Sequence, residues 1–541
     1  MRQHPDNNRL STGDALFLYL EREGMPLNVA SISIFEGNIS RQLCSRFIES
    51  KLPLIPRYRQ RLRKSPFNIG IPEWEFDPEF DIRNHVREVS LREGTEAELK
   101  SVAGKILSTV MDRHHPLWDF TVVHGLEHNC TAIITRIHHC LADGLAGVDL
   151  LNTIMDSTPE VRPLPKKRTT FPISSPKKGT LLDELVGSSV ALAERALNAQ
   201  VGLFNVFQRI LMAAVHANGN SNGNHLDEKP LASLPSADQL ARLMPEVTAA
   251  TQRLPFNVIC RGPQSFAWSE IPLADLKAVK NACGVTINDV ALTIMAATIR
   301  CYSVLRGVNP KGRLLRIVIP VSVRTNGHAH DLGNQITFLP VTLPLEISKP
   351  LKWLAAIRER IAFLKGAHLA ECVSIFGTML GTIPTAAQEL MGRIVSQIPL
   401  GLCNLIFTNV PGPEAPLYLH GHKMLRCYPY VPIGGDIGIN CAMLTYNGTA
   451  YFGFTGDVHA APDLRRLEKL LKASFSELKQ AAGVSKRRIS PGHKPTVTHA
   501  QTSKKNPAKM RTDPKAFETV GNIDPEEQSE REVHPRVAIG A

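Results

Sequence analysis

Two adjacent histidines followed by an acidic turn are the residues of this chain best suited to chemistry. His138 and His139 end a β-rich run, and a turn containing Asp143 and Gly144 leads into a helical pattern. The unperturbed pKa of histidine lies nearest to neutral pH, so an imidazole suits general-base catalysis. A strand end would hold the ring on a rigid element, Asp143 would brace the loop, and Gly144 would permit a sharp turn. The pattern indicates a candidate general base aimed at a cleft.

Other interpretations of the histidine pair stay open from the residues alone. The pair could be buried and structural. A metal site is disfavoured, because adjacent strand residues face opposite sides of a sheet and no cysteine cluster supplies further ligands. His124 and His128 have HxxxH spacing, but Gly125 and Asn129 favour a turn, which need not place both rings on one face. Serine-hydrolase GxSxG and phosphate-binding P-loop motifs are absent.

Two blocks of mixed helix and strand must position these residues. In the first block, apolar spacing predicts strands at 29–35, 120–123 and 131–138, and helices at 14–23, 96–111 and 145–155. In the second block it predicts strands at 265–271, 314–323, 335–343, 404–410, 438–444 and 450–454. Helices are expected there at 286–304, over most of 350–390, and at 463–480. Thr286 is the expected N-cap of the first of these helices.

Length and composition set the expected domain organisation. The chain has 541 residues, which is too long for one core of the usual ~100–200 residues. The apolar fraction of 43% and the charged fraction of 21% are typical of a globular protein. We predict an N-terminal domain over 1–160, a connector over 161–255 with an apolar helix at 201–215, a C-terminal domain over 256–482, and a basic, disordered tail over 483–541.

Charge and hydropathy exclude several classes of protein. The net charge is +12, but residues 485–511 hold eight Lys or Arg and no acid, so specific nucleic-acid binding is not predicted. No run of about 18 apolar residues lacks polar interruptions, which argues against a polytopic membrane protein. The N-terminus has no apolar segment typical of a secretory signal. The ten cysteines form no CxxC pair, which indicates reduced, buried thiols in a cytosolic protein.

Ordered motifs along the chain resemble one acyltransferase family. His138-His139-x-x-x-Asp143-Gly144 is the HHxxxDG signature of acyltransferases that resemble chloramphenicol acetyltransferase. Further segments are similar to bacterial wax ester synthase/diacylglycerol acyltransferases and span roughly Leu10 to Gln480. They are Leu10-Ser11-x-x-Asp14, Met25-Pro26-Leu27-Asn28-Val29, Trp74, Phe80-Asp81-Ile82, His85-Val86-Arg87, Pro116-Leu117-Trp118, Asn288-Asp289, Pro320-Val321-Ser322-Val323-Arg324, Gly333-Asn334 and Asn409-Val410-Pro411-Gly412-Pro413. Two mild departures from the family pattern are Arg113-His114-His115 and Thr408.

The resemblance implies an α/β (α+β) fold of two chloramphenicol-acetyltransferase-like domains, with the active-site channel between them. The implied reaction moves a fatty acyl group from acyl-CoA to a diacylglycerol or a long-chain alcohol. It needs no cofactor, no metal and no acyl-enzyme. His139 would be the general base beside His138, Asp143 would brace the loop through an ion pair with Arg324, and Gly144 would shape the turn.

The remaining motif residues would belong to the channel and to its shape. The resemblance places Asn288 and Asp289 on the channel from the second domain, although amides and acids also suit an ordinary helix start. Cys140 is expected to be structural. The expected shape elements are Pro116, Leu117, Trp118 and Gly412.

The acceptor implied by the resemblance is insoluble in water. We therefore expect a cytoplasmic enzyme that touches the inner face of the cell membrane or lipid inclusions peripherally, through the 201–215 helix or the basic tail. Two alternatives stay open: a condensation-type acyltransferase of secondary metabolism, and a non-catalytic lipid-inclusion protein. The absence of a carrier-protein module disfavours the first, and the intact HHxxxDG residues disfavour the second. The preferred acceptor and the acyl chain length stay open.

Overall fold

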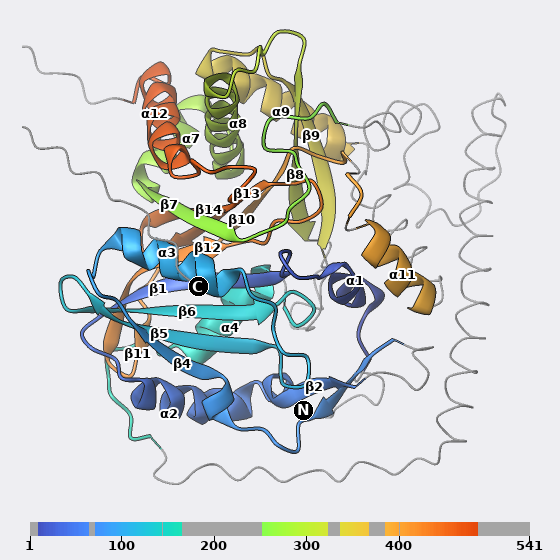
Figure 1. The fold of residues 1–541 in the computed structure, drawn as a ribbon. Coiled ribbons are helices and arrows are strands. Elements are labelled where there is room, and N and C mark those ends of the chain that lie inside the picture. The colour runs from blue at the N-terminus through green and yellow to red at the C-terminus, as the bar shows by residue number, and fades with distance from the viewer. Residues whose placement is uncertain are drawn as a thin grey trace, which may run out of the picture. The chain divides into compact units, whose positions relative to one another are not determined.

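Two six-stranded sheets organise the part of the chain that the computed structural model describes (Figure 1). That part comprises residues 9–63, 71–142, 144–164, 251–322, 336–366, 385–395, 397–399 and 401–484. It belongs to one unit that runs to Lys486. Each sheet carries its own cluster of buried apolar side chains, with Phe35 and Phe47 in the first and Tyr302 and Trp353 in the second.

The first sheet has the strand order β11-β12-β1-β6-β5-β4. Its strands are β11 (Tyr418–Leu419), β12 (His422–Tyr430), β1 (Asn28–Glu36), β6 (Cys130–His138), β5 (Trp118–Leu126) and β4 (Val86–Ser90). All neighbours are antiparallel except β4 and β5. Its helices are α1 (Thr12–Leu20), α2 (Arg41–Lys51), α3 (Glu96–Leu107) and α4 (Gly144–Ile154), with the short turns η1 (Leu52–Leu54), η2 (Pro56–Arg59) and η4 (Ile82–Asn84). A separate pair, β2 (Gln60–Arg63) and β3 (Glu73–Phe76), lies beside it.

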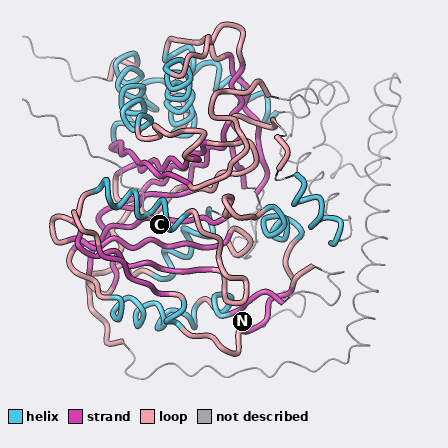
Figure 2. Tube along the Cα trace, in the orientation of Figure 1, coloured by secondary structure: helices cyan, strands magenta, loops and turns pink. Residues whose placement is uncertain are grey.

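The second sheet has the order β7-β14-β13-β10-β8-β9. Its strands are β7 (Gln264–Pro272), β14 (Thr449–Asp457), β13 (Ile439–Tyr446), β10 (Leu405–Val410), β8 (Leu314–Ser322) and β9 (Ile336–Pro344). Strand β10 runs parallel to both of its neighbours, and the other pairs are antiparallel. The helices α7 (Leu273–Cys283), α8 (Ile287–Leu305), α9 (Pro350–Gly366) and α12 (Arg466–Ala481) lie above this sheet, while α11 (Thr385–Val395) lies next to α1 (Figures 1 and 2).

A strand exchange joins the two halves of the sequence. Strands β11 and β12 follow β10 in the chain, yet β12 pairs with β1 of the first sheet, Ala30 opposite Tyr430. Gly453 of β14 lies against this strand so closely that an added Cβ would sit 1.7 Å from the carbonyl oxygen of Pro429. A division of the chain at 256 therefore separates the two sheets except for this hairpin, and the hairpin fixes one sheet on the other.

The secondary structure agrees with most of the sequence-based expectations. Each strand and helix predicted within the described residues is present, although the stretch expected as helix over 350–390 contains α9 and α11 with 367–384 outside the description. The patterns did not predict the helices α2 and α7 or the strands β2, β3, β4, β11 and β12. The connector helix at 201–215 and the tail beyond Val484 lie outside the described residues. Within them no single helix could span a membrane; α7 and α8 satisfy that length and composition test only together, bent by 102°.

Candidate active site

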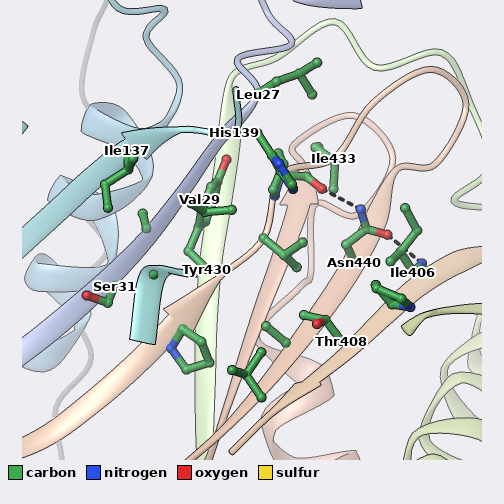
Figure 3. A pocket seen from close by; sticks show the side chains of 18 of the residues that line it. Leu27, Val29, Ser31, Ile137, His139, Ile406, Thr408, Tyr430, Ile433 and Asn440 are labelled. Carbon is green, nitrogen blue, oxygen red and sulfur yellow. Dashed lines mark hydrogen bonds between the residues drawn. The ribbon is translucent and has the colours of Figure 1, made fainter. Parts of the chain in front are cut away.

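A cavity of about 670 Å³ lies between the two sheets (Figure 3). Strands β1 and β6 and helix α4 supply one wall, and β10, β13 and the segment after β12 supply the other. The lining is mostly apolar, with side chains such as Val29, Ile137, Ile406 and Ile433. Figure 3 shows His139 and Asn440 among these side chains. The size and the apolar lining of the cavity suit an apolar ligand.

His139 follows the end of β6 and lines this cavity. Its backbone N–H donates to the carbonyl oxygen of Leu27 at 2.9 Å, which ties the histidine loop to the start of β1. Its ring stacks on Phe17 of α1, with the ring centroids 3.8 Å apart and the planes inclined by 8°. The residue is 9% exposed. It is the one imidazole among the described residues that line the cavity, and the stack and the backbone bond fix where it lies.

His138 has a different environment, as expected for the preceding strand residue. Its side chain is fully buried, and its backbone N–H donates to the carbonyl oxygen of Leu117 at 3.0 Å. Its Nδ1 accepts the N–H of Cys140 at 3.1 Å, so the ring proton lies on Nε2, which is 3.4 Å from Oε1 of Glu21. His138 therefore links the histidine loop to Glu21, and it is not among the described residues that line the cavity.

Glu21 is a buried carboxylate that the sequence patterns did not single out. Its side chain is 1% exposed; Oε1 accepts the N–H of Leu27 and Oε2 accepts from Nη2 of Arg113, both at 3.0 Å. Burial alone would raise the pKa of Glu21, but His138, the Leu27 N–H and Arg113 together lower it to about 2. Glu21 fixes the N–H of Leu27 while the carbonyl of Leu27 holds His139. The sequence feature that could have pointed to Glu21 is Arg113, its ion-pair partner, which stands out only as a departure from the family pattern.

The loop after His139 is described only in part. Asp143 and Arg324 both lie outside the described residues, and so do Gly333 and Asn334; the ion pair expected between Asp143 and Arg324 stays a prediction. Helix α4 begins at Gly144, where the sequence placed the turn into a helix. Cys140 is buried, and burial raises the pKa of its thiol well above the ordinary value.

The Pro116-Leu117-Trp118 segment lies beside the histidine loop. Leu117 is fully buried and accepts the backbone N–H of His138. Trp118 donates from Nε1 to the carbonyl oxygen of Tyr58 at 2.7 Å, and its ring stacks on His85 with a centroid distance of 4.3 Å. Pro116 accepts the N–H of Trp118 at 2.9 Å. These contacts hold the start of β5 next to His138, and the role of the segment as a shape element stays a prediction.

Asn288 and Asp289 have different surroundings. Asp289 completes a capping box at the start of α8: its carboxylate accepts the Thr286 N–H at 2.9 Å, and its own N–H donates to the Thr286 hydroxyl at 3.1 Å. Asn288 accepts a long hydrogen bond, 3.4 Å, from Nδ2 of Asn409, which lines the cavity. Neither residue is among the described residues that line the cavity. Asn288 contacts the cavity-lining Asn409, and Asp289 caps the helix.

Gly412 follows the end of β10 and lies against Thr445 of β13. An added Cβ there would sit 2.2 Å from the carbonyl oxygen of Thr445, and the N–H of Gly412 donates to the Thr445 hydroxyl at 3.1 Å. The adjacent Asn409, Val410 and Pro411 line the cavity. The glycine therefore permits the close approach that puts these residues in the cavity wall.

Replacing Gly412 by alanine is expected to destabilise the fold by about 1–3 kcal/mol, because backbone must move to admit the methyl group. Thermal unfolding of the purified variant measures this loss. Gly13→Ala is the matched control, since the nearest atom to an added Cβ at Gly13 is 3.8 Å away. Equal melting temperatures of the Gly412 variant and the control would contradict the steric argument.

The polar groups around the cavity restrict the chemistry. Among the described residues no three His, Cys, Asp or Glu side chains gather into a metal-binding group. The thiol of Cys427 lines the cavity, but burial raises its pKa to about 11, so it is not a thiolate at neutral pH. Asp436 also lines the cavity, and its Oδ2 accepts the N–H of Gly401 at 3.1 Å. The arrangement suits an imidazole that takes a proton from a bound hydroxyl group.

Comparison with protein families gives two matches, which follow one another along the chain with residues 292–331 between them. The wax ester synthase/diacylglycerol acyltransferase catalytic domain matches residues 10–291, and the WS/DGAT C-terminal domain matches residues 332–479. The first match alone covers more than half of the chain and contains the histidine loop, α1 and the start of α8.

Individual relatives agree with these matches. The chain is 27% identical over 492 residues to the probable diacylglycerol O-acyltransferase tgs1 of Mycobacterium tuberculosis, covering 89% of this chain and 97% of that one. The solved wax ester synthase/diacylglycerol acyltransferase from Marinobacter aquaeolei VT8 is similar in fold, with a TM-score of 0.59, 22% identity, and coverage of 88% and 100%. A condensation domain of the calcium-dependent antibiotic synthetase has a TM-score of 0.51 at 13% identity, covering 88% of this chain and 97% of that domain.

Proposed function

Since the chain belongs to the wax ester synthase/diacylglycerol acyltransferase family, we propose that His139 is the general base with which it transfers a fatty acyl group from acyl-CoA to the hydroxyl of a diacylglycerol or a long-chain alcohol. The observation that carries this role is the position of His139. The imidazole lies in a largely apolar cavity between two sheets, held by the Phe17 stack and by the Leu27 carbonyl.

The reaction runs in two steps around this imidazole. His139 accepts the proton of the acceptor hydroxyl as that oxygen attacks the thioester carbonyl, which forms the new C–O bond and a tetrahedral oxyanion. The oxyanion collapses, the C–S bond breaks, and the CoA thiolate takes the proton from the imidazolium. Ester and free CoA result, and the base is regenerated. A positioned base of this kind is typically worth about 10²–10⁴-fold in rate.

The state of two cysteine thiols, one beside His139 in the chain and one in the cavity wall, favours direct transfer between the substrates. Burial raises the pKa of Cys140, next to His139, and that of Cys427, in the cavity wall. A thiol whose pKa is raised is a poor nucleophile, because the thiolate is the reactive form. These observations support acyl transfer without an acyl-enzyme on either cysteine.

Replacing Cys140 by alanine is therefore expected to leave kcat within about threefold of the original, since only a thiol that takes no part in the chemistry is removed. The steady-state rate of CoA release with palmitoyl-CoA and hexadecanol measures this. A loss as large as that of a general-base variant would assign Cys140 a chemical role and would overturn direct transfer.

The character of the cavity supports long-chain substrates. Leu151 and Ile154 of α4 and Met155 directly after it line the cavity on one side, and Ile406, Val410 and Leu444 line it on the other. Apolar burial favours alkyl chains at about 0.8 kcal/mol per buried CH₂ group. Because such acceptors are stored in lipid phases, the proposal includes peripheral contact with a membrane or a lipid inclusion.

An assay with two acceptors tests the proposed function. Purified protein is incubated with palmitoyl-CoA and either dipalmitoylglycerol or hexadecanol, and the lipid products are separated. Triacylglycerol or wax ester is the expected product, and the ratio of their rates assigns the preferred acceptor. Absence of both esters from a folded preparation would contradict neutral-lipid synthesis and would favour a different acceptor or a non-catalytic lipid protein.

A further inference from the structure

Large exposed apolar side chains occur on α11, on α1, which packs against it, and in the stretch that follows α11. Leu390 is 61% exposed, Ile394 49% and Leu402 57%. Leu16 of α1, Met391 and Ile398 are each at least 40% exposed. We call these six residues the α1–α11 face: Leu16, Leu390, Met391, Ile394, Ile398 and Leu402. Exposed apolar patches on a protein surface often mark sites of interaction with other molecules or with membranes.

Helix α11 is attached to the protein by its small and polar side. Gly392 lies against Tyr19 of α1, where an added Cβ would be 2.8 Å from the Tyr19 backbone oxygen. Gln388, one turn earlier, is 7% exposed. An amphipathic helix normally turns its apolar stripe to the core. In α11 the apolar side chains of Leu390, Met391 and Ile394 are instead exposed, and Figure 1 shows the helix at the edge of the described structure.

The α1–α11 face is continuous with the reaction cavity. Ile398 is 44% exposed and Leu402 57% exposed, and both also line the cavity. From α1, Phe17 and Leu20 line the cavity and are half-buried. Phe17 is also the ring on which His139 stacks. The cavity lining thus includes both exposed members of the α1–α11 face and the ring that stacks on the proposed base.

We propose that the α1–α11 face docks on a lipid surface and that the acceptor enters the cavity from that surface between α1 and the side chains of Ile398 and Leu402. This inference rests on the proposed function, because a water-insoluble acceptor must pass from a lipid phase to His139. Helix α11 would lie in the plane of the interface with its apolar side among the lipids, as amphipathic surface helices do.

The charges at the edge of the α1–α11 face fit a surface with anionic lipids. The guanidinium of Arg253, an exposed residue, donates to the carbonyl oxygen of Pro399 at 3.3 Å and has no carboxylate partner among the described residues. On α11, Glu389 and Arg393 neutralise each other at 2.7 Å. Arg253 therefore places a positive charge beside Pro399, next to Ile398 of the α1–α11 face, which favours binding near anionic headgroups.

The test uses two double variants of the full chain. Leu390→Gln with Ile394→Gln makes the α1–α11 face polar without adding charge. Val304→Gln with Leu305→Gln is the control at the far end of α8, where the two side chains are 41% and 58% exposed. Binding is measured by flotation with vesicles of phosphatidylcholine and phosphatidylglycerol. Transfer from octanoyl-CoA is measured to dioleoylglycerol in the same vesicles, and separately to hexanol in solution.

The Leu390/Ile394 variant is expected to bind vesicles at least about tenfold more weakly and to lose a similar factor on vesicle-borne dioleoylglycerol. Its rate with dissolved hexanol should equal that of the original and of the control. Vesicle binding unchanged from the original would overturn the proposal. An equal loss with hexanol would also overturn it, because the residues would then act on chemistry or folding. Loss of a dimer instead of vesicle binding would assign the face to a second copy of the chain.

The same experiment separates failure of docking from failure of the proposed function. If the original protein forms no ester with either acceptor, the acyl-transfer proposal fails, while flotation of the variant still decides whether the α1–α11 face binds lipid. If the original transfers to hexanol but neither floats with vesicles nor uses their dioleoylglycerol, the transfer proposal stands and the docking proposal falls.

Discussion

Replacing His139 by alanine is expected to lower kcat for acyl transfer by about 10²–10⁴-fold, because no other group is then positioned to take the acceptor proton. Among the described residues that line the cavity there is no second imidazole, and the one carboxylate, Asp436, accepts the Gly401 N–H. Steady-state CoA release with palmitoyl-CoA and hexadecanol measures the loss. Since the base acts on bound substrate, kcat should fall while KM changes little.

His114→Ala is the matched control for that variant, since His114 is an exposed histidine outside the cavity lining. It should retain the original rate. The melting temperature of each variant separates catalysis from folding. A His139→Ala protein that is folded and transfers acyl groups at the original rate would remove His139 from the mechanism. Retention of lipid binding without any transfer in the original would favour the non-catalytic interpretation.

Replacing Glu21 by glutamine is expected to destabilise the folded protein by roughly 3 kcal/mol at pH 7. That figure follows from the lowering of the Glu21 pKa from 4.5 to about 2 at a side chain that is 1% exposed. The amide would leave Arg113 and the Nε2 proton of His138 facing a weaker acceptor. Activity should fall by about tenfold or more as well, since Leu27 holds His139 and small displacements at a reacting group are costly.

The direction of the Glu21 pKa shift determines at which pH the variant is less stable than the original. A carboxylate whose pKa is lowered on folding stabilises the protein above the unfolded pKa of 4.5, and the contribution disappears as the pH falls toward 2. The melting temperatures of the original and of Glu21→Gln should therefore differ at neutral pH and converge as the pH falls from 4.5 toward 2. Glu23→Gln, at an exposed position two residues later, should match the original throughout. Parallel profiles for Glu21→Gln and the original would contradict the buried-charge account.

The sequence predicted the fold through elements whose side chains follow one simple period. Strand β6 is a β-rich, mostly buried run that ends at the histidine pair, and Thr286 caps the start of α8 with the capping box that its residues favour. Strand β12 was missed because His422, Lys423, Arg426 and Pro429 interrupt the apolar pattern of its sequence. Its pairing with β1 joins residues about four hundred positions apart, and no local pattern encodes such a contact.

The site shows the same division between local and distant information. A motif with its own spacing revealed His138 and His139, whereas Glu21 acts through contacts with Leu27, Arg113 and His138 that only the fold brings together. Asp289 illustrates the reverse case. The sequence offered two interpretations of Asp289, a channel residue and an ordinary helix-start residue. In the structure Asp289 forms the capping box at the start of α8, which is the second interpretation.

The measurement that tests the central claim most directly follows both products of one reaction. With palmitoyl-CoA labelled in the acyl group and hexadecanol or dipalmitoylglycerol as acceptor, the free CoA thiol and the labelled ester are quantified over the same time course. The account predicts one ester for each CoA released and no labelled protein after denaturation. Release of CoA with free palmitate instead of ester, or an acyl group retained on the protein, would contradict direct acyl transfer to a hydroxyl activated by His139.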